Sequence, residues 1–294
     1  MFLLIGSIVL ASYLTLFFKV VERLRLNNLQ VIVFNYITCV VTGSLLNGAF
    51  PLNRDNLTAP WFPWACAMGA VFIFLFNIIG YTAQQLGVAV TSVANKLSLV
   101  IPFLFSIYLY NEPDTILKYT GIALALVAVI LTCYRPAPAP QKGISSPRSK
   151  YLLLLPVILF LGSGLLDTMI KYVESTFLND QNKNDFIVAA FFIAALLGII
   201  TLVLQQMVKK RNMEFRAILA GIALGVPNYF SIWCLVKVLK QFGGKSSAII
   251  PINNMGIVLF SAIVAWLVFG EKLLTINWIG VLLSMVAIAL IAYG

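Results

Sequence analysis

Long apolar segments alternate with short polar ones along the whole chain of 294 residues. A helix that crosses the hydrocarbon core of a bilayer needs about 20 apolar residues. Ten segments meet this requirement: Phe2–Val20, Leu29–Leu46, Pro63–Ala83, Val90–Tyr110, Leu117–Cys133, Tyr151–Lys171, Phe186–Val208, Ile218–Val236, Ser246–Phe269 and Ile276–Tyr293. The pattern predicts an all-α polytopic membrane protein with ten transmembrane helices.

One clear break divides this series. Residues 135–150 read RPAPAPQKGISSPRSK, and alternating Pro and Ala favours an extended spacer with a basic end. We expect residues 1–134 to form a first five-helix repeat and residues 151–294 a second, within one membrane domain. Because five is odd, the second repeat enters the membrane from the opposite side, so the two repeats are predicted to be inverted.

The end of each half repeats a similar pattern of apolar and polar positions, at an offset of 159 residues. The offset superposes Asn95 on Asn254, Glu112 on Glu271 and Gly121 on Gly280. Inverted repeats that meet at a site near the midplane are a recurring plan of secondary transporters. The two glutamates lie in turns, where we expect them to cap the next helix or to meet a basic residue.

Composition narrows the class of protein further. The chain is 61% hydrophobic and 10% charged, against about 45–50% and about 25% for soluble domains. Its net charge is +10, and the basic residues are spread over short loops. Basic residues that flank membrane helices in this way orient the protein in the bilayer, and their scatter argues against nucleic-acid binding. The chain has no His, no CxxC pair, no phosphate-binding loop and no HExxH. We therefore expect no metal, no cofactor and no enzyme activity, and transport driven by a gradient or by exchange.

The chain resembles the drug/metabolite transporter superfamily, in its EamA-like branch. The resemblance is carried by the five-plus-five pattern, by a Glu at the end of the fourth helix of each half, by Gly121 and Gly280, and by a Lys near the end of each opening helix, Lys19 and Lys171. It implies a central cavity lined by helices 1, 3, 4, 6, 8 and 9, with helices 5 and 10 at the periphery. It also implies cytoplasmic termini, whereas the excess of basic residues after helices 1, 5, 7 and 9 predicts external ones.

Lys96 is the main candidate for substrate binding, because a charge within a membrane helix is costly and usually functional. Asn95 lies beside it and Ser92 shares its helical face. Together they would suit an anionic group such as a carboxylate or phosphate. The alternative is that Lys96 extends along its helix to bring its amine to the membrane interface.

Asp167 is the candidate for ion coupling. It is a carboxylate within an apolar segment, and Ser163 and Lys171 lie four residues away on the same face. The alternative is a structural ion pair with Lys171. Asn254, the repeat partner of Asn95, is predicted either to bind substrate or to form a hydrogen bond between helices.

Three further residues complete the predicted site: Asn77, Tyr81 and Trp233. Amides beside aromatic rings could orient a planar substrate, although Tyr and Trp are also common at membrane interfaces.

The sequence therefore predicts a carrier for a small polar metabolite that works by alternating access, as a monomer or homodimer in a lipid bilayer, which we expect to be a bacterial inner membrane. The resemblance favours export. A lipid-modifying membrane enzyme and a non-transporting scaffold protein remain alternatives.

Overall fold

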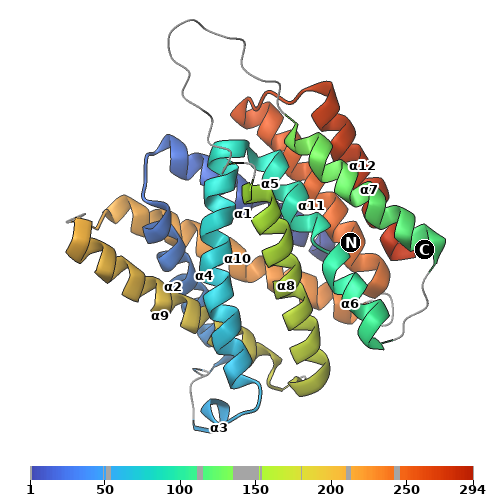
Figure 1. The fold of residues 1–294 in the computed structure, drawn as a ribbon. Helices are drawn as coiled ribbons and strands as arrows, with labels where there is room; N and C mark the ends of the chain where they lie inside the picture. Colours follow the sequence, from blue (N-terminus) through green and yellow to red (C-terminus); the bar gives the residue numbers. More distant parts are fainter. Residues whose placement is uncertain are drawn as a thin grey trace, which may run out of the picture.

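The computed structural model describes residues 2–48, 50, 54–110, 115–134, 152, 154–179, 181–209, 213–241 and 246–293. These residues form twelve helices (Figure 1): α1 (Phe2–Arg23), α2 (Asn28–Asn47), α3 (Arg54–Leu57), α4 (Phe62–Leu86), α5 (Val88–Leu97), α6 (Val100–Tyr110), α7 (Ile116–Cys133), α8 (Leu154–Phe177), α9 (Lys183–Lys209), α10 (Phe215–Gln241), α11 (Ser246–Phe269) and α12 (Thr275–Tyr293). The predicted linker at residues 135–150 and Glu112 lie outside the described residues.

The predicted fold class, an all-α polytopic membrane protein, is confirmed. Nine spans of the described chain are long and apolar enough to cross a membrane, and Thr275–Ile291 is a shorter apolar helix that completes the predicted ten. Five of these spans precede the predicted linker and five follow it. Helix ends differ from the prediction by a few residues, most of all at α8, which runs to Phe177.

The prediction of one continuous helix over Val90–Tyr110 is wrong. α5 ends at Leu97 and α6 begins at Val100. Pro102 explains the break, because proline has no N–H to donate to the carbonyl oxygen four residues earlier, and its ring clashes with that carbonyl group. The carbonyl oxygen of Ser98 instead accepts a tighter bond from Ile101 N–H at 2.9 Å. The fourth span is therefore two short helices.

A second proline lies inside α10, at Pro227. The proline leaves the carbonyl group of Ala223 without its helical donor. The Tyr13 hydroxyl of α1 donates to this oxygen at 3.3 Å. An interhelical hydrogen bond therefore replaces the missing backbone bond and joins the first half to the second.

The two halves are interleaved throughout the bundle (Figure 1). Helix α10 packs against α1 and α2, α9 packs against α2 and α4, and α11 packs against α1 and α5. One buried cluster surrounds Phe18, Tyr36 and Leu224, and another surrounds Leu97, Val258 and Ile288. Neither half can therefore bury its apolar faces alone, and the core lies at the boundary between them.

Helices α7 and α12 pack against each other at one side of the bundle, in the peripheral position expected for helices 5 and 10 (Figure 1). A Cβ atom at Gly121 would lie 2.8 Å from Ile291, and one at Gly280 would lie 2.6 Å from the backbone nitrogen of Thr132. Thr132 and Ile291 are themselves separated by the repeat offset of 159 residues. The contacts are therefore reciprocal, and they make the two helices antiparallel, as an inverted repeat requires.

Candidate functional site

A cavity of about 200 Å³ lies among α1, α4, α5, α10 and α11, so both halves contribute to it. Its polar lining residues are Ser7, Thr15, Ser92, Asn95, Lys96, Asn228, Ser231 and Asn253. Its apolar lining residues are Ala11, Leu14, Phe76, Ile79, Ile232, Leu235 and Ile257. These helices are spans 1, 3, 4, 8 and 9 of the predicted ten. Span 6, which is α8, was also expected here but contributes none of these residues.

Lys96 supplies the cavity with a positive charge. It lies in the last turn of α5, next to the helix break, and its side chain is part of the cavity wall together with Asn95 and Ser92. Every other lining residue is neutral. Of the two alternatives, the described geometry therefore favours the orientation toward the cavity over the one toward the membrane interface.

Hydrogen bonds hold one side of the cavity wall in place. Asn228 of α10 donates from Nδ2 to Oδ1 of Asn35 on α2 at 3.1 Å, deep between the two helices. The Ser231 hydroxyl donates to the carbonyl oxygen of Asn228 at 2.8 Å, and the Ser7 hydroxyl donates to the carbonyl oxygen of Ser231 at 3.3 Å. These bonds connect α1, α2 and α10 around the cavity and orient the amide of Asn228.

Two polar atoms of the wall have no hydrogen-bond partner in the described structure. They are the Oγ atom of Ser92 and the Oδ1 atom of Asn253, on side chains that are 2% and 3% exposed. Buried polar groups in proteins are almost always paired, so such exceptions need an explanation. Because both side chains line the cavity, a bound polar molecule would satisfy them.

Asp167 of α8 lies beside the cavity without lining it. Its carboxylate lies near the Ser98 hydroxyl, which itself donates to the carbonyl oxygen of Asn95, and interacts electrostatically with Lys96. α8 can approach closely here because a Cβ atom at Gly164 would lie 2.6 Å from the Cβ atom of Ile101. The structure thus places the predicted coupling residue against the predicted substrate-binding lysine.

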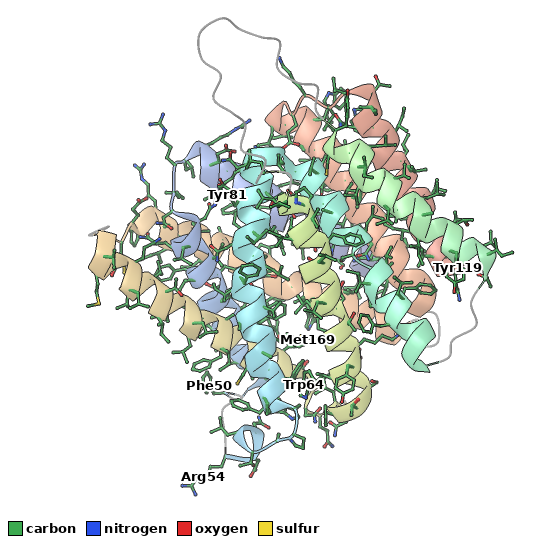
Figure 2. All side chains as sticks on the ribbon, viewed as in Figure 1. Phe50, Arg54, Trp64, Tyr81, Tyr119 and Met169 are labelled. Atoms are coloured by element: carbon green, nitrogen blue, oxygen red, sulfur yellow. The ribbon has the colours of Figure 1, made fainter. Side chains whose placement is uncertain are left out.

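The other predicted site residues lie elsewhere. Asn254 is half-buried and does not line the cavity, whereas its neighbour Asn253 does. The Asn77 side chain donates back to the carbonyl oxygen of its own helix at Ile73, at 2.7 Å. Tyr81 is 46% exposed on α4 (Figure 2).

Trp233 lines a separate pocket of about 40 Å³ beside Phe191 and Tyr229. The ammonium group of Lys237 lies 4.2 Å from the centre of the Trp233 ring. The structure therefore brings Lys96, Asn95 and Asp167 together but places Asn77, Tyr81, Asn254 and Trp233 outside the central cavity.

Among the polar lining residues that were not predicted from the sequence are Ser7, Thr15 and Ser231. Ser7, Ala11 and Thr15 recur at intervals of four, which places three small or polar side chains on one face of a mostly apolar helix. That stripe was the available signal on α1. Ser231 lies three residues after Asn228 and shares its face, but its polarity alone marks no function.

Comparison with known proteins gives three results. Residues 149–293, just under half of the chain, match the model of the EamA-like transporter family. An uncharacterized protein of Haemophilus influenzae is 26% identical over 294 residues, which cover 99% of this chain and 97% of that protein. A solved crystal structure with 15% sequence identity superposes with a TM-score of 0.59, over 98% of this chain and 94% of the other.

The fold defines a polytopic α-helical membrane protein with a polar cavity between its two halves. The second half of the chain matches the EamA-like transporter family, and this match confirms the resemblance to the drug/metabolite transporter superfamily. Members of that family are transporters rather than enzymes. The low-identity crystal structure supports the fold alone.

Proposed function

We propose that this protein is a carrier that moves a small anionic polar metabolite across the membrane by alternating access. The observation that carries the proposal is the position of Lys96, a half-buried cation in an otherwise neutral cavity that both halves line. A charged side chain among membrane helices usually faces the interior of the bundle and marks a substrate or ion pathway. The substrate's carboxylate or phosphate would pair with the ammonium group of Lys96.

The rest of the cavity wall supports a substrate with polar and apolar parts. The Asn253 Oδ1 atom would accept a hydrogen bond from a substrate hydroxyl or amine, and Ser92 could donate to an oxygen. Phe76, Ile79 and Ile257 would contact an apolar portion. Pockets of this kind combine apolar walls with a few polar groups that fix orientation.

Asp167 is the proposed coupling residue. When the cavity is empty, its carboxylate compensates the charge of Lys96, with which it interacts. A substrate anion that binds Lys96 would compete with this interaction and free the carboxylate for a proton. The cycle is then driven by a gradient or by exchange. Export and a bacterial inner membrane complete the proposal, supported by the family match and by the bacterial relative, and the carrier acts as a monomer or homodimer.

A ligand-dependent melting screen on the purified protein tests the proposal. A ligand that binds the folded state raises the melting temperature by mass action. We expect small carboxylates or phosphates to stabilise the wild type and to lose this effect in Lys96→Ala. Lys118→Ala is the matched control, because Lys118 packs on Phe103 outside the cavity and its loss leaves the response intact. Equal responses of the wild type and Lys96→Ala to every anion would refute the assignment of Lys96.

A further inference from the structure

Helix α5 is a short unit with a break at each end. It has ten residues, begins directly after Gly87 and ends before the break that precedes α6. It carries Ser92, Asn95 and Lys96 of the cavity wall. Its position relative to α1 and α11 therefore sets the shape of the site.

The N-terminus of α5 has no cap of its own. The first N–H groups of a helix lack intrahelical acceptors, and a side chain at the N-cap usually supplies one. The N-cap residue here is Gly87, which has no side chain to offer. The acceptor comes instead from the other half: the Oε1 atom of Glu271 accepts a hydrogen bond from the N–H group of Val88 at 2.8 Å.

Glycine at position 87 is what allows the carboxylate to approach. A Cβ atom there would lie 2.9 Å from the Oε2 atom of Glu271, and the backbone φ of 95° also disfavours other residues. A negative charge at this point is further favoured by the partial positive charge of the helix N-terminus. The sequence predicted that Glu271 would cap the next helix or meet a basic residue, whereas the structure shows it capping α5 of the first half.

Glu271 is itself held firmly to α11. Gly270 ends that helix with a φ of 67°, and the N–H group of Glu271 donates to the carbonyl oxygen of Ala265 at 3.1 Å. The hydrogen bond to Val88 therefore joins α5 of the first half to the turn between α11 and α12 of the second.

The hydrogen bond lies at one end of the bundle, next to a second hollow. This vestibule has a volume of about 450 Å³, and its lining includes Lys19, Gly87, Val90, Glu271 and Lys272. We call this end of the molecule the Glu271 end.

The vestibule and the central cavity share none of their described lining residues, and buried side chains lie between them. Along α1, Phe18 lies between Thr15 of the cavity and Lys19 of the vestibule, and its side chain is 0% exposed. Along α5, Thr91 lies between vestibule and cavity residues and is 1% exposed. In the structure with the bond between Glu271 and Val88 formed, these two buried side chains lie between the cavity and the Glu271 end.

We propose that Glu271 is the latch that keeps the carrier closed at this end: its hydrogen bond to the N–H group of Val88 ties α5 to the second half, and the cavity opens into the vestibule when that bond breaks. The proposal rests on alternating access in the proposed function. It adds a positioning residue that touches no substrate and acts through α5.

Side-specific cysteine labelling tests the latch. Ala11→Cys, on the cavity wall, is introduced into a protein whose four native cysteines are replaced by alanine, and a membrane-impermeant methanethiosulfonate reagent with a sulfonate group is applied to right-side-out and inside-out vesicles. We expect Glu271→Ala to raise the labelling rate from the Glu271 end about tenfold, the change in an equilibrium constant that corresponds to about 1.4 kcal/mol. The rate from the opposite end should not rise.

Two further variants make the result specific. Glu271→Gln keeps the shape of the side chain and a neutral acceptor, so we expect a smaller increase and a normally folded protein even if Glu271→Ala folds poorly. Glu214→Gln removes a carboxylate from the N-terminal end of α10, outside the vestibule lining, and should change nothing.

Unchanged labelling from the Glu271 end in both Glu271 variants would overturn the latch, as would an equal increase from both ends. Labelling needs no ligand, so it is independent of the melting screen. If anions raise the melting temperature in a Lys96-dependent way but the Glu271 variants label like the wild type, only the latch is refuted. One-sided labelling in the Glu271 variants without any response to anions counts against the proposed substrate class.

Discussion

The amide of Asn228 is held by that of Asn35: the Nδ2 atom of Asn228 donates to the Oδ1 atom of Asn35 across 3.1 Å, between α10 and α2. Asn228 lines the cavity, and Asn35, which is fully buried, does not. Asn35 is therefore a positioning residue. It fixes which face of the Asn228 amide meets the cavity.

Replacing Asn35 should weaken ligand binding at a distance. Asn35→Leu keeps the approximate volume but removes the acceptor, so the Asn228 amide is free to rotate. We expect a smaller ligand-induced rise in melting temperature than in the wild type. Thr38→Val is the control, because the Thr38 hydroxyl bonds only within its own helix, to Phe34 at 2.7 Å. An undiminished ligand response in Asn35→Leu would contradict the positioning role.

The Ser92 hydroxyl has no hydrogen-bond partner in the described structure, so its removal should stabilise the ligand-free protein and weaken ligand binding. Leaving a buried polar group unsatisfied costs about 1–3 kcal/mol. Ser92→Ala should therefore raise the melting temperature of the ligand-free protein and reduce the shift that a ligand causes. Such a trade of stability for function is common at binding sites.

Ser261 provides a control for that experiment. Its hydroxyl is also buried without a partner in the described structure, but it does not line the cavity. We expect Ser261→Ala to stabilise the ligand-free protein in the same way and to leave the ligand-induced shift intact. If Ser92→Ala and Ser261→Ala behave alike in both measurements, the Ser92 hydroxyl does not contact ligand.

A double-mutant cycle measures the interaction between Lys96 and Asp167. Removing either charge leaves the other without its electrostatic partner, so Lys96→Met and Asp167→Asn should each lower the melting temperature of the ligand-free protein. The double variant should lose less stability than the two single variants lose together. The difference, which is the coupling free energy, should be at least about 0.5 kcal/mol. Additive losses would show that the two charges act independently, and would remove the basis for Asp167 as the coupling residue.

The reciprocal glycine contacts of α7 and α12 predict a matched pair of stability losses. In Gly121→Ala and Gly280→Ala the added methyl group meets the facing helix, at Gly280 its backbone. Overpacking of this kind typically costs about 1–3 kcal/mol. Gly6→Ala is the control, because its nearest neighbour would be the Cys234 sulfur at an ordinary 3.6 Å. Thermal unfolding in detergent checks all three, and a Gly280→Ala protein as stable as the Gly6→Ala variant would contradict the packing.

The polar stripe on α2 shows what a local sequence pattern can predict and what it cannot. Asn35, Thr38 and Thr42 share one face of the helix, which indicates a packing surface within the bundle. The structure confirms this: a Cβ atom at Gly225 of α10 would lie 2.6 Å from Thr38. The pattern identifies the buried face. It does not identify α10 as the partner, because the choice among neighbouring helices depends on shapes far away in the chain.

The ten spans, the break between the halves and the internal repeat were determined by the sequence alone. Each apolar segment partitions into lipid on its own length and composition, since a helix satisfies its backbone hydrogen bonds internally. The candidate charges Lys96 and Asp167 were visible for the same reason, because a charge inside an apolar segment stands out without any knowledge of its neighbours.

Only the tertiary structure decided how these parts meet. It placed Asn253 rather than Asn254 on the cavity wall, set Asp167 against Lys96, and directed Glu271 to the N-terminus of α5 instead of the next helix. Each of these outcomes depends on the rotation of a helix about its axis and on its choice of partner. In a membrane both are set by close packing and hydrogen bonds between helices, and these belong to no single segment.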